Sequence, residues 1–165
     1  GPAGPKRSVC IAGVTMERFR KIRRNKKEYM ELLLEADPAE EMIDQYLADG
    51  ALFILEEDGR LLAAAVVVML GEQECELKNL AVAETVRKRG YGRKMVEYLC
   101  GLYRKTCCRM YVGTADVPCG CMDFYRTLGF RYTHTVKGFF SQYPEPVYEN
   151  GMLVTDMAYF VKELS

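Results

Sequence analysis

The sequence lacks three features that would each point to a class of protein: net charge, a long apolar run and an apolar segment at its start. Its 165 residues include 23 lysines and arginines and 23 aspartates and glutamates, so the net charge is zero. Nucleic acids and membrane surfaces usually bind proteins with net positive charge, so neither partner is expected. No apolar run approaches the roughly 20 residues of a membrane-spanning helix, and no signal peptide is recognisable. We therefore expect a cytoplasmic protein.

Histidine is also scarce, which bears on metal binding. His134 is the only one, and the cysteines lack the paired C-x-x-C spacing of zinc sites, because Cys107-Cys108 precedes Cys119-x-Cys121. The cysteines number seven, an odd count, and no export signal accompanies them, which argues against a disulfide framework. We expect reduced, mostly buried thiols and no metal site.

The length is that of one domain, with enough chain to bury a sizeable core. We expect a single domain over residues 9–165, preceded by an untethered tail or cloning remnant at 1–8.

Hydrophobic periodicity predicts the order of helices and strands. Helices are expected at 26–35, with Asn25 as its cap, then from Asp37-Pro38 to just before Gly50, and at 92–105 and 122–128. Strands are expected at 18–23, 51–56, 61–70, 74–82, 109–114, 130–136 and 153–161, with an aromatic loop at 139–150. Short turns make the strands at 51–82 an antiparallel meander, and the helical crossover makes 109–114 parallel to 74–82.

The most informative stretch runs from the strand at 74–82 through a glycine turn into the next helix. Gly90 and Gly92 would let a ligand approach the backbone, where the first turn of a helix offers free N–H groups. Basic residues add positive charge at the same place: Arg87, Lys88, Arg89, Arg93 and Lys94. The turn has neither the third glycine of a dinucleotide fingerprint nor the Gly-Lys-Ser/Thr of a P-loop. It predicts a site for pyrophosphate.

Two motifs in this sequence resemble those of the GCN5-related N-acetyltransferase (GNAT) superfamily. Arg87-x-x-Gly90-x-Gly92 after a strand is similar to the family's acetyl-coenzyme A signature. Phe124 to Phe130, FYRTLGF, is similar to the family's tyrosine helix followed by Gly-Phe. The resemblance implies an α/β (α+β) fold in which a central mixed sheet of about seven strands, with an antiparallel meander, is flanked by about four helices.

The resemblance also implies where acetyl-CoA binds. Backbone N–H groups of Arg87 to Arg93 would hold the pyrophosphate, and the end of the preceding strand would pair with pantetheine in a gap between two splayed strands. Thr114 would replace an asparagine that the family often uses. The implied cofactor-binding residues are Leu80, Ala81, Val82, Arg87, Lys88, Arg89, Gly90, Tyr91, Gly92, Arg93, Thr114 and Tyr125.

Two catalytic roles follow from the same resemblance. Tyr125 matches the tyrosine that protonates the departing thiolate, although a core aromatic is the alternative. Glu76 matches the general base of histone-acetylating members, and Glu74 or a water chain are alternatives. His134 is either an edge residue or an acceptor-site group.

The expected activity is transfer of the acetyl group from acetyl-CoA to an amine of a small molecule by direct attack. Alternative acceptors are a peptide or protein amine, at an N-terminus or a lysine. A non-catalytic acetyl-CoA sensor is an alternative of another class. Within the superfamily, the sequence is similar to bacterial acetyltransferases of unassigned substrate. Asp37, Glu40 and Glu41 would suit a cationic amine, but acids are also common at helix starts. Monomer and homodimer both stay open.

Overall fold

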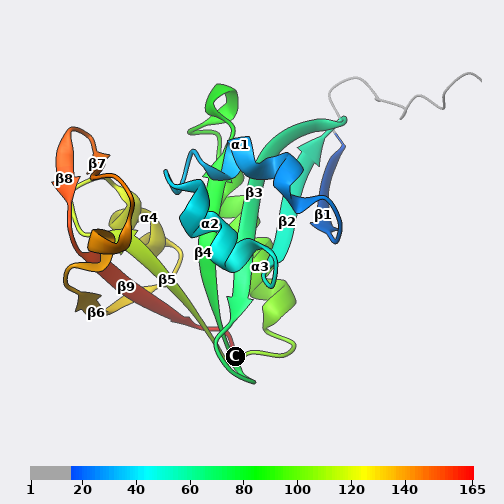
Figure 1. The fold of residues 1–165 in the computed structure, drawn as a ribbon. Helices are drawn as coiled ribbons and strands as arrows, with labels where there is room; N and C mark the ends of the chain where they lie inside the picture. The colour runs from blue at the N-terminus through cyan, green and yellow to red at the C-terminus, as the bar shows by residue number, and fades with distance from the viewer. Residues whose placement is uncertain (1–15) are drawn as a thin grey trace, which may run out of the picture.

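A seven-stranded sheet forms the centre of the fold in the computed structural model, which describes residues 16–165. Its strands are β1 (Glu17–Ile22), β2 (Ala51–Glu57), β3 (Arg60–Met69), β4 (Glu74–Val82), β5 (Arg109–Ala115), β6 (Arg131–Val136) and β9 (Met157–Glu163). They lie in the order β1-β2-β3-β4-β5-β9-β6 (Figure 1). Neighbours are antiparallel except β4 and β5, which are parallel as the helical crossover predicts. The predicted tail at 1–8 lies outside the described residues.

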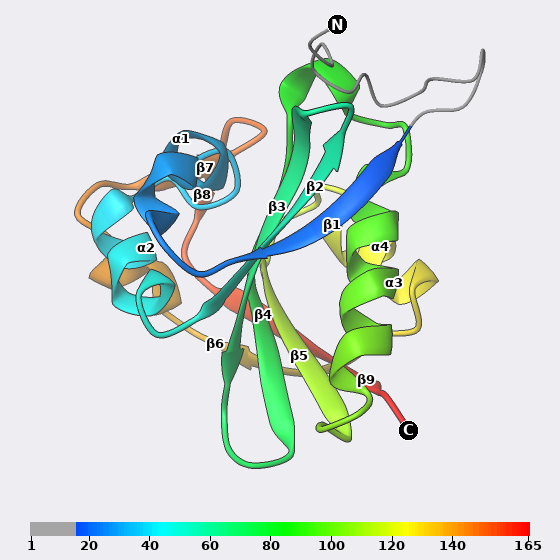
Figure 2. The same cartoon turned by 90° about the vertical axis from the view of Figure 1, so that its right-hand side faces the viewer.

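Helices cover both faces of this sheet (Figure 2). One face carries α1 (Met30–Leu33) and α2 (Glu40–Leu47), and the other carries α3 (Tyr91–Tyr103) and α4 (Cys121–Thr127). Short 3-10 helices lie at η1 (Lys26–Tyr29), η2 (Glu84–Val86) and η3 (Phe139–Gln142). The predicted α+β fold, with a mixed seven-stranded sheet and four α-helices, is confirmed. Over residues 16–165, no helix is long and apolar enough to cross a membrane.

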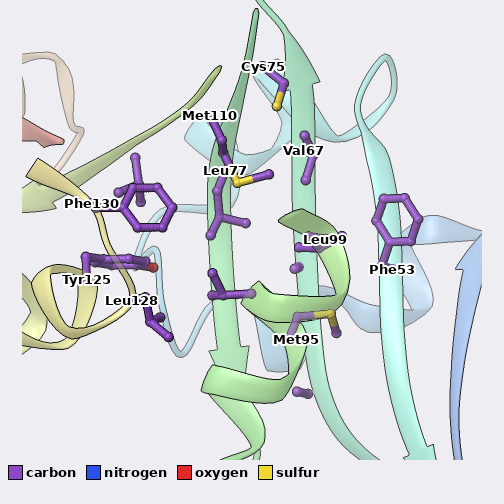
Figure 3. Packing of buried hydrophobic residues seen from close by; sticks show 14 of the residues in the cluster. Phe53, Val67, Cys75, Leu77, Met95, Leu99, Met110, Tyr125, Leu128 and Phe130 are labelled. Carbon is purple, nitrogen blue, oxygen red and sulfur yellow. The ribbon is translucent and has the colours of Figure 1, made fainter. Parts of the chain in front are cut away.

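Strand β3 separates two hydrophobic cores. Ala63, Ala65 and Val67 pack with α3 and α4 residues, whereas Ala64 and Val66 pack with α1 and α2 residues. Figure 3 shows the first core, in which Met95 and Leu99 of α3 lie over the sheet. A strand buried on both faces has no polar side, which explains why the sequence of β3 is almost continuously apolar.

The strand predicted at 153–161 is wrong, because the chain forms two short strands there. β8 (Met152–Val154) pairs with β7 (Val147–Glu149) in a separate hairpin, and only β9 joins the main sheet. Thr155 and Asp156 lie between them, and the Asp156 carboxylate accepts a hydrogen bond from the Gly138 N–H at 2.9 Å. This bond joins the segment between β8 and β9 to the residue that precedes η3, at a point where the apolar pattern alone suggested a continuous strand. The segment predicted as a loop at 139–150 contains η3 and β7.

The prediction that the Asn25 side chain caps the following helix is also wrong. Asn25 adopts a left-handed conformation with φ of 55°, and its side chain makes no capping hydrogen bond. The following Lys26 instead reaches the end of α2, where its Nζ donates to the carbonyls of Leu47, Ala48 and Gly50 at 3.1, 3.0 and 2.6 Å. A cation at a helix C-terminus satisfies carbonyls that have no intrahelical partner.

Lys26→Met is therefore expected to lower the free energy of unfolding by about 1 to 2 kcal/mol, because three carbonyls lose a charged donor. Urea denaturation followed by circular dichroism measures the change. Lys27→Met is the control, since Lys27 makes an exposed ion pair with Asp44, and such pairs contribute little. Equal stability of the Lys26 variant and wild type would contradict the assignment.

Candidate active site

The site begins where β4 and β5 separate. Their pairing runs from Glu74 opposite Arg109 to Leu77 opposite Val112 and stops there, although both strands continue (Figure 1). A cavity of about 340 Å³ occupies the gap and is lined by β4 residues 77–82 and β5 residues 112–115. The predicted splaying of these two strands is confirmed.

Backbone groups of β4 point into this gap. The Ala83 N–H donates to the Leu62 carbonyl of β3 at 2.8 Å. Because peptide groups alternate in direction along a strand, those of Leu80 and Val82 point away from β3. They border the cavity, where an extended ligand with amide groups could pair with them.

A β-bulge at Lys78 decides which side chains of β4 face which core. Leu77 lies opposite Val67 and Asn79 lies opposite Val66, so Lys78 is the additional residue. Leu77 packs in the core under α3, whereas the Asn79 amide donates to the Leu33 carbonyl beside α1 at 3.0 Å. The bulge thus brings Lys78 and Asn79 to the helical face that also carries α2.

The basic glycine turn lies at the mouth of the gap. Gly90 precedes α3 with φ of 88°, a conformation that glycine adopts without strain. In the described part of the chain, the N–H groups from Lys88 to Arg93 make no backbone hydrogen bond. These free donors at the N-terminus of a 13-residue helix, with Arg87 and Arg89 nearby, form a site that suits an anion.

Arg87 connects this turn to the opposite side of the gap. Its Nε donates to the Val82 carbonyl at 3.4 Å, and its Nη2 pairs with Glu35 at 3.2 Å. Both side chains are about half exposed, so the ion pair itself contributes little stability. The pair places a guanidinium at the cavity mouth, because Glu35 and Arg87 both line the cavity.

Tyr125 forms part of the cavity wall on the α4 side. Its ring packs edge to face against those of Phe124 and Phe130, with ring centroids 5.0 and 5.4 Å away. Figure 3 shows Tyr125 beside Leu128. The residue is 7% exposed, and burial raises the pKa of its hydroxyl above the usual value. The phenol therefore stays protonated at neutral pH and is available as a proton donor.

A second, smaller cavity of about 140 Å³ contains Glu76. The Glu76 side chain is 12% exposed, and burial raises the pKa of its carboxyl, an effect that Lys78 at 3.6 Å opposes. Glu74 lies further from the gap, paired with Arg109 at 3.0 Å, and lines neither cavity. His134 is exposed, stacks on Tyr159 with ring centroids 5.0 Å apart, and likewise lines neither.

A hydrogen-bonded group at the junction of the two cavities was not predicted. The Asp37 carboxylate accepts from the Tyr46 hydroxyl and from the Tyr143 hydroxyl, each at 2.9 Å. The Asn79 amide donates in turn to the Tyr46 oxygen at 3.1 Å. Sequence reasoning assigned Asp37 to the start of a helix, but α2 begins at Glu40 with Ala39 in the capping position. The helix predicted from Asp37-Pro38 therefore exists, but its cap lies two residues later than predicted, and Asp37 does not cap it.

Two buried polar atoms in this region have no partner within the described residues: the Thr114 hydroxyl and the Asn79 side-chain carbonyl oxygen. Both residues line the larger cavity, and Thr114 is 6% exposed. A buried polar atom without a partner costs free energy, so such atoms commonly mark the place of a ligand or water. The role of Thr114 in holding the co-substrate stays a prediction.

The opened sheet, the glycine turn with free N–H groups and the buried phenol form a site that would suit a long, phosphorylated co-substrate with amide groups. The sequence pattern of the acetyltransferase (GNAT) family matches residues 17–130. The chain belongs to this family. It is accordingly an acyltransferase, and acetyl-CoA is the co-substrate of its family.

Individual relatives agree with this membership. An uncharacterized N-acetyltransferase of Bacillus subtilis, YvbK, is 30% identical over 132 residues, which cover 79% of this chain and 85% of the relative. A GNAT family acetyltransferase from Elizabethkingia anophelis, solved with acetyl-CoA bound, has a TM-score of 0.85 and 31% identity, covering 89% of this chain and 97% of that one. A Bacillus subtilis acetyltransferase in complex with CoA has a TM-score of 0.83 and 27% identity, and the match covers 91% of this chain and 100% of that one.

Proposed function

We propose that this protein transfers the acetyl group of acetyl-CoA to an amine of a small molecule by direct attack. The observation that carries the proposal is that the two cavities adjoin, since Asp37, Leu77, Lys78, Gly113, Tyr143 and Met157 line both. One cavity opens along free strand backbone and the other holds a buried carboxylate. The small volume of the second cavity favours a small amine over a polypeptide acceptor.

The residues around the larger cavity suit acetyl-CoA, which supplies an acetyl group as a reactive thioester. Free N–H groups from Lys88 to Arg93 would hold the pyrophosphate, with Arg87 and Arg89 adding charge. Peptide groups of Leu80 and Val82 would pair with pantetheine amides, and Ala81 and Tyr91 would border it. Thr114 would give its free hydroxyl to the same arm.

Glu76 and Tyr125 would move the two protons of the reaction. Glu76 accepts the proton that the acceptor ammonium must lose before its nitrogen can attack. The new C–N bond forms as the C–S bond breaks, the nitrogen loses its second proton to water, and the Tyr125 hydroxyl donates a proton to the departing thiolate. Acetyl-CoA and the ammonium form of the acceptor thus give an N-substituted acetamide, CoA thiol and one released proton, and the phenol regains its proton from the acid formed at Glu76 or from water.

Gly92→Glu tests the co-substrate site and is expected to weaken acetyl-CoA binding at least about tenfold, because it adds a negative charge beside the pyrophosphate. Isothermal titration calorimetry measures the dissociation constant. Gly92→Ala is the matched control: its Cβ would lie 3.4 Å from Phe124 and 3.5 Å from Val82, in ordinary contact, and adds no charge.

Three results would contradict the proposal in different ways. Wild-type protein that binds no acetyl-CoA at high micromolar concentration would remove the co-substrate assignment. Retained binding without release of CoA thiol over a broad amine panel would favour a sensor, and preference for a peptide amine would replace the small-molecule acceptor.

A further inference from the structure

Asp37 is a buried carboxylate without a cationic partner. Its residue is 9% exposed, and no lysine or arginine forms an ion pair with it in the described part of the chain. Buried charges in proteins are normally paired with an opposite charge or with a metal. Lys78, which lines the same cavities, is instead paired with Glu76 at 3.6 Å. The smaller cavity is therefore lined by two carboxylates, those of Asp37 and Glu76, and by one ammonium group, that of Lys78.

The geometry leaves Asp37 able to bind a cation. Each of its oxygens accepts one tyrosine hydroxyl, from Tyr46 or from Tyr143. A carboxylate has about four lone-pair sites, so roughly two stay free for further donors. Because Asp37 lines both cavities, these sites are reachable from the place where the acceptor would lie.

The two tyrosines hold this carboxylate in place from two directions. Tyr46 comes from α2 and receives a hydrogen bond from Asn79 of β4, whereas Tyr143 follows η3. Two hydroxyl groups thus support Asp37 directly, and Asn79 supports one of them in turn. Tyr46 and Tyr143 also line the smaller cavity, where the Lys78 ammonium lies over the Tyr46 ring, 5.5 Å from its centroid.

We propose that Asp37 binds a second, non-reacting cationic group of the acceptor, so that the preferred acceptor is a small diamine. This inference rests on the proposed acetyl transfer. The reacting amine must lose its proton, which Glu76 accepts, so a lasting ion pair requires another ammonium on the same molecule. An acceptor with one amine would leave Asp37 without a cationic partner.

Three probes of similar length test the charge requirement: putrescine, butylamine and γ-aminobutyrate. They carry at one end an amine that can react and at the other an ammonium, a methyl group or a carboxylate. We expect kcat/KM, measured by CoA thiol release, to be about 10- to 100-fold higher for putrescine than for butylamine, and lowest for γ-aminobutyrate. Calorimetric titration of the protein saturated with CoA gives the affinity for each probe without turnover.

The Asp37→Asn variant tests whether Asp37 binds the second ammonium group of the acceptor or affects all acceptors equally. It keeps the shape of the side chain and should lower kcat/KM for putrescine about 10- to 100-fold while changing the value for butylamine little. Glu31→Gln is the matched control, since it removes an exposed carboxylate from the first turn of α1 and should leave the putrescine-to-butylamine ratio unchanged. Thermal denaturation of both variants measures any loss of folding.

The outcomes distinguish the alternatives. Equal kcat/KM for putrescine and butylamine, or no binding of putrescine to the CoA complex, would overturn the assignment of Asp37 while acetyl transfer to another amine stands. An equal loss for both probes in Asp37→Asn would make Asp37 a structural or proton-accepting group. Failure of acetyl-CoA itself to bind would instead remove the proposed function.

Discussion

Tyr125→Phe is expected to lower kcat by about 100-fold or more, because general acid catalysis commonly contributes factors of 10² to 10⁴. The variant removes one oxygen and keeps the ring that packs against Phe124 and Phe130. Since burial raises the pKa of this phenol, it stays protonated across the neutral range, and its loss should lower kcat at every pH in that range. Steady-state CoA thiol release measures the effect.

The matched control is Tyr132→Phe on β6. The Tyr132 hydroxyl is hydrogen-bonded to Thr135 at 2.7 Å and lines neither cavity, so the same chemical change there should not alter kcat. Unchanged turnover in Tyr125→Phe would remove the general-acid role and leave Tyr125 as a core aromatic. A changed dissociation constant for acetyl-CoA with unchanged kcat would assign it to binding.

Glu76→Gln is expected to lower kcat/KM for the acceptor by about 100-fold and to abolish the acidic limb of its pH profile. In the wild type, Glu76 must be ionised to accept a proton, so activity should fall as the pH drops through its pKa. Because burial raises that pKa, the fall should occur at a higher pH than for an ordinary glutamate. The pH dependence of CoA release measures both effects.

Lys78→Met tests the assignment of Glu76 as the proton acceptor by changing the pKa of its carboxyl. Lys78 lowers the pKa of Glu76, so its removal should move the acidic limb to higher pH without abolishing it. An acidic limb that persists in Glu76→Gln would show that another group or a water chain accepts the proton.

The glycine turn could be recognised from the sequence because local constraints specify it, whereas Tyr125 was assigned by the resemblance of its short helix to the family's motif. The left-handed conformation at position 90 favours glycine, and the free N–H groups follow from the start of α3. Tyr125 lies within one short helix, α4. The Asp58-Gly59 hairpin turn was predictable for the same reason, since both residues adopt positive φ.

The hydrogen bonds of Asp37 could not be assigned in this way, because one of its two partners is distant in sequence. Tyr143 lies 106 residues along the chain, and no local pattern records that their side chains meet. The division of the last predicted strand has the same origin, since Asp156 binds the Gly138 N–H across a loop. Local periodicity describes which face of an element is apolar, but not which distant polar groups share a buried space.

The sequence by itself determined the order of the α-helices and of the strands from β1 to β6, the parallel crossover and the glycine turn before α3, since each depends on residues close together in the chain. Only the tertiary structure decided where the bulge at Lys78 lies, that Glu76 and not Glu74 lines a cavity, and that Asp37 joins two cavities. Burial and hydrogen bonds between α2, β4 and the segment after η3 exist only once the sheet has assembled, so the acceptor side of the site is a product of packing.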